Sequence, residues 1–380
     1  MTDTDTAILG GGPAGAAAAI ALARAARRAL LLERDAAPRE AVCGEFLGPD
    51  AAAALARLGL DLPALGAAPL RRLRLGAGRR EAALDLPFPA WALPRRALDA
   101  ALRAAARDAG AQVAPGAAVR GAAPSGEGWR LRLHGGAEVA ARRAVLATGK
   151  HALRGWPRAP APPGALGLKL HLSGVEPGPE VVLLRFAGGY AGLLPLPEGE
   201  GGGANLCAAL QDGAPPGGAA RDPAALLARV AEGSALGARL LRGARPRWDR
   251  PLAVGAVPYG FRHGGGGGAG GPAGLFRVGD QVGVVPSFTG DGVAMALLSG
   301  LAAAEAIAAG GDAPRFHAEW RRRSAGPMRW AGLGAWAMRR VPRGFVAGTA
   351  LVPGVARALA RRTRMEGAAA SLADRRPPPP

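Results

Sequence analysis

The chain of 380 residues is 49% hydrophobic, which supplies a sizeable core and excludes an intrinsically disordered protein. Its formal net charge is +19, but the arginines are spread along the sequence and only 4% of the residues are aromatic. This distribution favours a basic globular protein over a nucleic-acid-binding protein, and it leaves an anionic membrane surface or an anionic cofactor as open partners.

The start of the chain predicts a βαβ unit. Residues 6–9 are a short apolar run typical of a buried strand, and residues 29–33 (ALLLE) are a second one. Residues 13–28 between them are mostly small and suit a helix packed closely on a sheet. A glycine-rich turn joins the first strand to this helix, as in dinucleotide-binding folds.

The turn has the spacing Gly10-x-Gly12-x-x-Gly15. The first glycine permits the tight turn, the second lets a pyrophosphate approach the backbone, and the third lets the helix pack on the strand. Backbone N–H groups at the start of the helix, from Ala14 onward, are expected to face the phosphates, and Pro13, which has no N–H, is assigned to the same site as the first helical residue.

Glu33 ends the second strand, where a carboxylate can accept hydrogen bonds from an adenosine ribose. We assign Glu33 and the adjacent Arg34 to the cofactor site. The alternative is a solvated glutamate beside Arg34. The opening stretch therefore predicts a bound dinucleotide, with NAD and FAD both open.

The next segment continues the pattern of helices and strands. Residues 51–58 predict a short helix and residues 95–108 a longer one with an apolar face. Three strands are expected at 129–133, 137–141 and 144–147, of which the first two form a hairpin.

The middle of the chain, about residues 166–257, changes to a period-two pattern that predicts a mostly antiparallel sheet in a second lobe. Residues 168–172 and 181–186 are examples. Lys169 and His171 alternate with leucines on the first of these strands. We expect them to form a polar, solvent-facing side, and a ligand-facing pair is the alternative.

The last part of the chain is predicted to be mainly helical. Its expected elements are a flexible glycine-rich loop (264–274), a strand (275–278), a helix (292–309), basic helices from residue 314 broken at Pro342 and Pro353, and a disordered proline tail (377–380). The tryptophans of the basic helices are expected to pack in the core rather than to anchor the chain in a membrane.

A second glycine-bearing element follows the strand at 275–278. Gly279 and Asp280 end that strand, and residues 286–293 (PSFTGDGV) lead into the next helix. Two remote glycine elements suit a long ligand that has adenosine at one end and a second group at a second helix start. FAD fits this description, whereas an NAD domain has no use for the second element.

At this point the chain resembles the glutathione-reductase-type flavoproteins that include geranylgeranyl reductases and the single-component (group A) aromatic hydroxylases. The resemblance covers about residues 6–364. It implies contacts to FAD from the strand end Thr148 and Gly149, from backbone near Val119, from the helix start at Arg95, and from Gly279, Asp280, Pro286, Gly290, Asp291, Gly292 and Val293.

Two segments resemble the geranylgeranyl-reductase branch more closely. Cys43-Gly44-Glu45 is similar to its Cys-Gly-Gly or Cys-Gly-Glu segment, and the resemblance implies that Cys43 and Gly44 lie where flavin and substrate meet. Residues 188–192, which include Tyr190, resemble its substrate-lobe strands. Cys43, Tyr190 and Pro286 are therefore the catalytic candidates, while burial of Cys43 and packing of Tyr190 are the structural alternatives.

The predicted fold class is α/β, with a Rossmann-like FAD-binding domain, an inserted, mostly antiparallel β substrate lobe and C-terminal helices. The expected bounds are 1–65, 93–164 and 258–315 for the FAD-binding domain, 66–92 and 165–257 for the lobe, 316–372 for the helices and 373–380 for the tail.

The predicted function is an FAD-dependent oxidoreductase that NADPH or NADH reduces. The reduced flavin either hydroxylates an aromatic or polyketide-like ring or saturates a double bond of an isoprenoid. The alternatives are a non-catalytic FAD-containing interaction protein and a basic nucleic-acid-binding protein. No metal site is expected from the histidine spacing. Two cysteines and an N-terminus without basic residues fit a cytoplasmic protein, with peripheral membrane contact left open.

Overall fold

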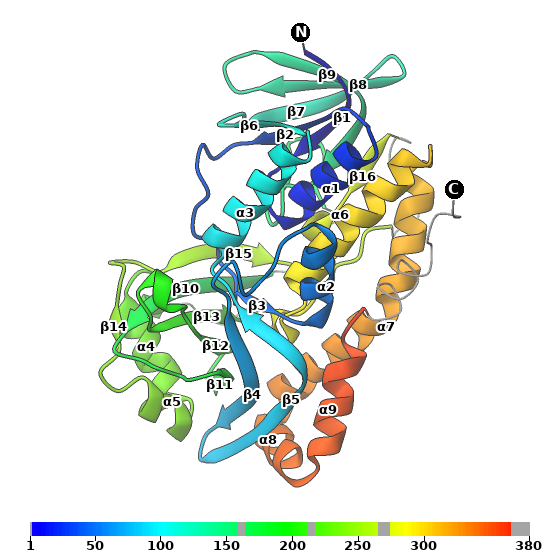
Figure 1. Ribbon diagram of the computed structural model, residues 1–380. Helices are drawn as coiled ribbons and strands as arrows, with labels where there is room; N and C mark the ends of the chain where they lie inside the picture. Colours follow the sequence, from blue (N-terminus) through cyan, green and yellow to red (C-terminus); the bar gives the residue numbers. More distant parts are fainter. Residues whose placement is uncertain (1, 159–163, 212–216, 265–273, 366–380) are drawn as a thin grey trace.

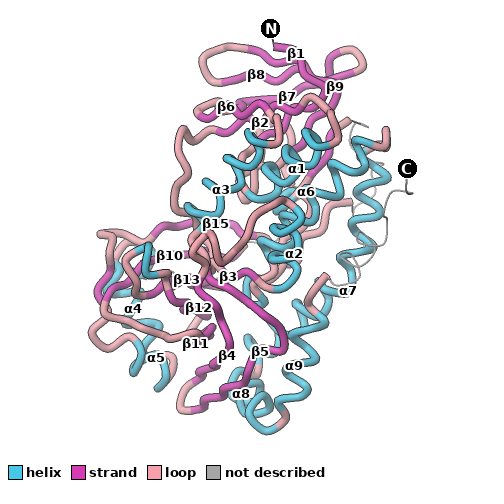
Figure 2. The backbone as a smooth tube through the Cα atoms, viewed as in Figure 1, coloured by secondary structure: helices cyan, strands magenta, loops and turns pink. Residues whose placement is uncertain are grey.

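The computed structural model describes residues 2–158, 164–211, 217–264 and 274–365, which form two β-sheets surrounded by helices (Figures 1 and 2). The predicted α/β fold is confirmed, with its N-terminal βαβ unit, a second and mostly antiparallel sheet, and helices at the C-terminal end. The predicted glycine-rich loop lies almost entirely outside the described residues, and the predicted tail lies wholly outside them.

The first sheet has seven strands and contains the βαβ unit. Its parallel strands are β6 (Gln112–Pro115), β2 (Ala29–Glu33), β1 (Thr2–Leu9), β9 (Glu138–Leu146) and β16 (Leu275–Arg277). An antiparallel hairpin, β7 (Val119–Ser125) and β8 (Gly128–Leu133), extends it beside β9. The strands expected at 137–141 and 144–147 are one continuous strand, β9. Because parallel strands end at the same edge, the segments that follow β1, β9 and β16 meet there.

The second sheet has nine strands and is antiparallel except between β4 and β11. Its strands are β14 (Arg245–Pro246), β10 (Ala165–Ser173), β13 (Ala204–Leu210), β12 (Gly189–Pro195), β11 (Glu180–Phe186), β4 (Ala68–Ala77), β5 (Arg80–Ala92), β3 (Phe46–Leu47) and β15 (Leu252–Val257). The long β4–β5 hairpin was not resolved into strands by the sequence, which assigned 66–92 only to the second lobe.

Helices cover both sheets. They are α1 (Pro13–Arg24), α2 (Pro49–Arg57), α3 (Arg95–Asp108), α4 (Pro223–Glu232), α5 (Ala235–Leu240), α6 (Gly292–Ala308), α7 (Ala313–Arg340), α8 (Pro342–Leu351) and α9 (Pro353–Arg362). α7 packs on β16 at one end, while α8 and α9 reach the β4–β5 hairpin of the other sheet (Figure 1). Among the described helices, none combines the length and the apolar character needed to cross a bilayer.

The two helices that follow the predicted glycine turns, α1 and α6, lie side by side (Figure 1). Their contact is very close, because a Cβ at Gly300 of α6 would overlap the carbonyl oxygen of Ala14 in α1. A Cβ at Gly279 would lie 3.1 Å from the Cβ of Ala14. Small residues at these positions therefore bring two segments from opposite ends of the chain together.

Candidate functional site

A continuous cavity of about 930 Å³ lies between the two sheets and extends to the C-terminal helices. It connects the glycine turn after β1 with the start of α6. The predicted site residues that line it are Gly10, Gly12, Pro13, Ala14, Glu33, Arg34, Cys43, Gly44, Arg95, Val119, Thr148, Gly149, Tyr190, Gly279, Asp280, Gly290, Gly292 and Val293. Gly15, Pro286 and Asp291 are not among the lining residues.

The three glycines of the first turn differ in their surroundings. Gly10 has a φ of +113°, and a Cβ there would lie 2.5 Å from the carbonyl oxygen of Ala147. A Cβ at Gly15 would overlap the carbonyl oxygen of Gly10. At Gly12, in contrast, the nearest atom to an added Cβ is Nη2 of Arg95 at 3.6 Å. Gly10 and Gly15 therefore serve the fold, while Gly12 leaves space beside the start of α1 for a ligand.

Three side chains spaced four residues apart on α3, Arg95, Asp99 and Arg103, line the cavity next to this turn. Arg95 donates two hydrogen bonds to Asp99, of 3.1 and 2.9 Å. Arg103 donates to the carbonyl oxygen of Gly11 at 3.1 Å and lies 3.5 Å from Glu33. Arg103 was not predicted from the sequence, although its position two helical turns after Arg95 on the same helix could have indicated it.

Glu33, predicted to contact a ribose, is buried and lines the cavity. Its Oε2 accepts a hydrogen bond from the backbone N–H of Gly11 at 2.6 Å, and its Oε1 accepts one from Asp35 at 2.9 Å. A carboxylate oxygen can accept more than one hydrogen bond, so Glu33 can hold the glycine turn and still accept from a ligand hydroxyl.

Hydrogen bonds also fix the segments that follow β9 and β16. Gln281 donates to the carbonyl oxygen of Gly149 at 2.7 Å, which ties one strand end to the other. The N–H of Gly279 donates to Ser299 of α6 at 2.8 Å. These contacts fix the segments that carry Thr148 and Asp280, both of which line the cavity.

Asp291 lies directly before α6, but its carboxylate is buried and pairs with Arg364 from the far C-terminal end. Burial raises the pKa of Asp291 even though Arg364 opposes this shift. The side chain therefore ties the end of the described chain to α6 instead of lining the cavity. Arg364 itself lines the cavity, and its guanidinium carbon Cζ lies 4.4 Å from the ring centre of Phe88.

The segment around Cys43 is held from several sides at the middle of the cavity. Asn205 of β13 donates to the carbonyl oxygens of Cys43 and Gly44 at 3.2 and 3.0 Å. Lys150 donates to the carbonyl oxygen of Val42 at 3.1 Å. Glu45 adopts a positive φ of 65° and accepts a hydrogen bond from the N–H of Arg95 at 2.8 Å. The segment is therefore a fixed part of the cavity wall.

Lys169 and His171 do not form the expected solvent-facing side of β10. Lys169 is fully buried and His171 nearly so. The ammonium of Lys169 lies 2.5 Å from Glu45 and 2.6 Å from Glu40. Burial favours the neutral amine, but the two carboxylates outweigh it and hold the pKa of Lys169 above its usual value. The alternating pattern of β10 correctly predicts that Lys169 and His171 share one face of the strand, but residues 40–45 cover that face.

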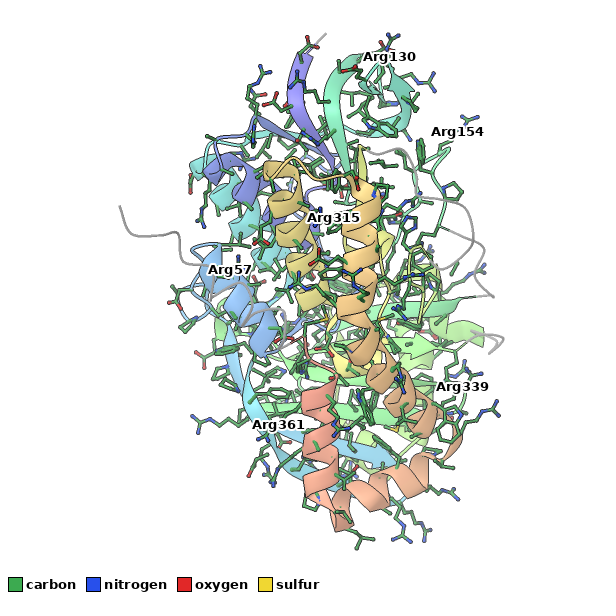
Figure 3. All side chains as sticks on the ribbon, turned by 90° about the vertical axis from the view of Figure 1, so that its right-hand side faces the viewer. Arg57, Arg130, Arg154, Arg315, Arg339 and Arg361 are labelled. Carbon is green, nitrogen blue, oxygen red and sulfur yellow. The ribbon has the colours of Figure 1, made fainter. Side chains whose placement is uncertain are left out.

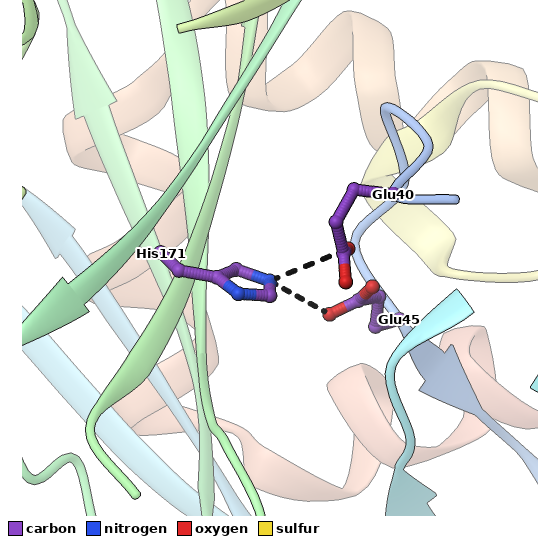
Figure 4. Close-up of side chains that lie close together, drawn as sticks. All are labelled: Glu40, Glu45 and His171. Carbon is purple, nitrogen blue, oxygen red and sulfur yellow. Dashed lines mark ion pairs between the residues drawn. The ribbon is translucent and has the colours of Figure 1, made fainter. Parts of the chain in front are cut away.

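His171 completes this cluster from the same strand. Figure 4 shows its ring directed at both carboxylates, 3.6 Å from Glu45 and 3.7 Å from Glu40. The possible ligand atoms of these three residues lie within 4.8 Å of one another. The ammonium of Lys169 lies between the two carboxylates, whereas Oε2 of Glu45 and Nε2 of His171 are buried without a hydrogen-bond partner among the described residues.

Three hydroxyl groups meet at the cavity wall beside the loop that precedes α6. Tyr190 and Tyr259, the two tyrosines of the chain, both hydrogen-bond to Ser287, the latter at 2.7 Å. Burial raises the pKa of both phenols above the ordinary value. Three O–H groups share two O···O contacts, so one hydroxyl proton remains for a ligand. Tyr259 was not predicted as a site residue, and Ser287 lies in the predicted 286–293 segment without having been assigned a role.

The end of the cavity beyond these hydroxyls is apolar. Its walls come from β4, β5, β11 and β12 on one side and from α7, α8 and α9 on the other. The large apolar side chains that line it include Leu73, Leu75, Leu86, Phe88, Val181, Leu183, Leu194, Phe288, Trp330, Phe345 and Leu359. The cavity thus combines a polar, glycine-lined part with an apolar chamber.

Residues 3–152 match the family model described as an FAD binding domain. The match includes the βαβ unit and its glycine turn, and it does not extend to β16 or α6. Two curated relatives match part of the chain. The menaquinone reductase of Mycobacterium tuberculosis is 35% identical over 154 residues, which cover 38% of this chain and 37% of the relative. The menaquinone reductase of Mycolicibacterium smegmatis is 34% identical over 123 residues, covering 31% and 30%. The matches thus span only 37% and 30% of the lengths of these relatives.

Solved flavoproteins share the whole fold. The flavin-dependent brominase Bmp2 superposes with a TM-score of 0.79 at 21% identity over 98% of both chains. A geranylgeranyl bacteriochlorophyll reductase-like protein from Thermoplasma acidophilum gives 0.69 at 19%, over 100% of this chain and 98% of that one. The halogenase PltM in complex with phloroglucinol and FAD gives 0.68 at 14%, over 98% and 86%. These structures confirm the predicted resemblance at the level of the fold, and the family model supports it over residues 3–152.

Gly12 offers a test of FAD binding that leaves the fold intact. We expect Gly12→Val to weaken FAD binding by about a hundredfold or more, because the added atoms fill the space where the pyrophosphate approaches. The backbone at Gly12 has φ −79° and ψ −173°, which valine adopts. Fluorescence titration of the apoprotein with FAD measures the affinity, and denaturant unfolding measures stability.

Gly199→Val is the matched control, since Gly199 is exposed and an added Cβ there has no atom within 4 Å. It should bind FAD normally. Gly15→Ala should instead unfold the turn, because its Cβ overlaps the backbone. Normal FAD affinity in Gly12→Val would place the pyrophosphate elsewhere.

Proposed function

We propose that the protein is an FAD-dependent oxidoreductase that saturates a carbon–carbon double bond in an apolar, isoprenoid-bearing substrate, with NADPH or NADH as the electron donor. The observation that carries the proposal is one cavity that joins the FAD-binding glycine turn, the paired tyrosines and an apolar chamber. The menaquinone reductases matched over part of the chain support a substrate of this class.

The residues fit FAD on the evidence of their geometry. Gly12, Gly44 and Gly292 line the cavity at positions where an added Cβ meets no atom closer than 3.6 Å, so a flat or extended ligand can approach the backbone. The helices α1 and α6 both begin at the cavity and direct positive dipole ends toward it. When bound, FAD supplies hydride transfer, which no side chain can provide.

Saturation of a double bond needs a proton as well as a hydride. The phenols of Tyr190 and Tyr259 stay protonated at neutral pH, because the ordinary pKa of a tyrosine is 10.0 and burial raises the pKa of each further. Ser287 links them, so a proton given up by one phenol can be replaced through the serine from the other. We assign the paired tyrosines as the proton donors and the fixed Cys43 segment as the wall that positions the substrate.

Hydroxylation of an aromatic or polyketide-like ring is the second candidate. The apolar chamber favours it too, because this chemistry needs a pocket that excludes water. It differs from saturation in consuming molecular oxygen, which makes the two separable.

The test is turnover of menaquinone by the FAD-loaded protein with NADPH or NADH, in the absence and presence of oxygen, followed by mass spectrometry. We expect anaerobic formation of a product that has gained two hydrogen atoms and keeps them after the quinol is reoxidised in air, because reduction of the quinone ring alone would be reversed by that step. A product that has gained one oxygen atom, formed only in air, would establish hydroxylation instead. Bound flavin that neither NADPH nor NADH reduces with any apolar substrate would indicate a non-catalytic FAD protein.

A further inference from the structure

The exposed large apolar side chains of the described residues are gathered at one end of the molecule. They are Leu333, Trp336, Val341, Leu351, Val352 and Val355, with 50–81% of each surface exposed. They lie in the last part of α7, between α7 and α8, at the end of α8, between α8 and α9, and in the first turn of α9. Single exposed apolar residues are normal on a protein surface, but a group confined to three consecutive helices marks an interaction surface.

The same helices carry apolar residues on their inner side. Trp330, Phe345 and Leu359 face inward and line the apolar chamber of the cavity. α8 also packs on β4 and β5. One side of these helices therefore closes the chamber, while the opposite side presents Trp336, Leu351 and their neighbours to the surroundings. We call this outer side, residues 329–362, the C-terminal face.

The charge of the C-terminal face is entirely positive. Residues 320–365 contain no aspartate or glutamate. The exposed arginines of the face are Arg329, Arg339, Arg340, Arg343, Arg361 and Arg362. In Figure 3, Arg339 at the end of α7 and Arg361 on α9 are both labelled on the lower part of the molecule. Among the described residues, the salt bridges include none of these six arginines.

We propose that the C-terminal face docks on the surface of an anionic lipid bilayer. Helices that combine exposed valine, leucine and tryptophan with arginines, and lack acidic residues, match the two requirements of an interfacial helix. The apolar side chains enter the boundary between headgroups and acyl chains, while the arginines contact lipid phosphates. The turn between α8 and α9, with Leu351, Val352 and Val355, is the part expected to enter deepest.

The charge pattern decides between a bilayer and a second copy of the chain. Two copies of the C-terminal face would bring arginines against arginines, with no acidic residue in the face to pair them. A phosphate-bearing surface is complementary to every arginine of the face. Because these helices also close the apolar chamber, docking would place the chamber wall next to the acyl chains, where an apolar substrate is dissolved.

The test uses the FAD-loaded full chain and sedimentation with phosphatidylcholine vesicles, prepared with and without phosphatidylglycerol. We expect binding to vesicles that contain phosphatidylglycerol and weakening of this binding by added salt. The triple variant R339Q/R340Q/R343Q should bind about 100-fold more weakly, since each arginine near an anionic surface contributes about fivefold. The variant L351S/V352S/V355S should lose binding at all salt concentrations.

The matched control is R130Q/R132Q/R154Q, which removes three exposed arginines at the opposite end of the molecule, where Figure 3 labels Arg130 and Arg154. It should bind vesicles as the unchanged protein does. Flavin absorbance confirms that each variant remains folded and loaded. Equal loss in the control, or failure of the unchanged protein to bind phosphatidylglycerol vesicles, would overturn the proposal.

Light scattering provides a second decisive result. A dimer that L351S/V352S/V355S converts to a monomer would show that a second copy covers the C-terminal face, and this too would overturn the proposal. Vesicle binding is measured without substrate, so its outcome is independent of which reaction the flavin catalyses.

Discussion

Replacing Lys169 with methionine is expected to lower the free energy of unfolding by about 3–5 kcal/mol, because it leaves two carboxylates without their buried cation. Glu45 is 2% exposed and lies 2.5 Å from the ammonium. Methionine keeps the volume of the stem, so the loss comes from charge and not from a cavity. Chemical denaturation of the FAD-free protein at neutral pH measures it.

The pH dependence of this effect has a defined sign. Burial opposes ionisation of Glu45, but His171, Lys169 and the Arg95 backbone outweigh it and hold the pKa of Glu45 below 4.5. Its contribution is therefore complete above pH 4.5 and is lost as the pH falls through the lower folded-state value. The pKa of Lys169 is held above 10.5, so its contribution is complete below that pH and lost above it. Between about pH 5 and 9 the pair should contribute a constant amount.

In Lys169→Met this plateau should disappear. Without the ammonium, burial raises the pKa of Glu45, and the folded protein takes up a proton that the unfolded chain does not. The variant should then lose stability as the pH rises from 5 to 8, unlike the unchanged protein. A flat profile would show that the carboxylates find another partner.

Two further variants separate charge from packing. The additional changes Glu40→Gln and Glu45→Gln should restore most of the stability of Lys169→Met, because no unpaired charge remains. Lys150→Met alters the other lysine of the chain. It removes one hydrogen bond to a neutral carbonyl, from Val42, and should cost about 1 kcal/mol.

The parts of the site that the sequence could predict are those encoded by neighbouring residues. The roles of Gly10, Gly12 and Gly15 follow from the backbone of one turn, and the structure shows the crowding at Gly10 and Gly15 and the open space at Gly12. The helix at 95–108 was predicted with the bounds that α3 has, because its apolar spacing is local.

The parts that could not be predicted depend on contacts between distant segments. Alternation along β10 correctly places Lys169 and His171 on one face, but only the segment at Glu40, 129 residues earlier, decides that this face is buried. Asp291 was expected to contact FAD, yet its side chain pairs with Arg364, 73 residues away. Tyr259 belongs to no recognisable sequence motif, and its place in the site depends on its hydrogen bond to Ser287.

The double variant Tyr190→Phe/Tyr259→Phe is expected to slow saturation of the substrate double bond by about 10²–10⁴-fold, the usual contribution of a positioned proton donor. Each single variant should lose much less, because Ser287 keeps a hydrogen bond to the remaining phenol. Phenylalanine keeps the rings in place, including the edge-on contact between Tyr190 and Phe288 at 6.0 Å, so unfolding should change little.

Two readouts distinguish proton donation from packing. The rate at which NADPH reduces the bound flavin needs no proton from these phenols, so it should be unchanged in the double variant while product formation slows. In the unchanged protein, burial raises the pKa of Tyr190 well above 10.0, so the rate should stay constant past the pH where an ordinary tyrosine ionises. If the double variant slows both rates equally, the tyrosines shape the cavity and the proton comes from elsewhere.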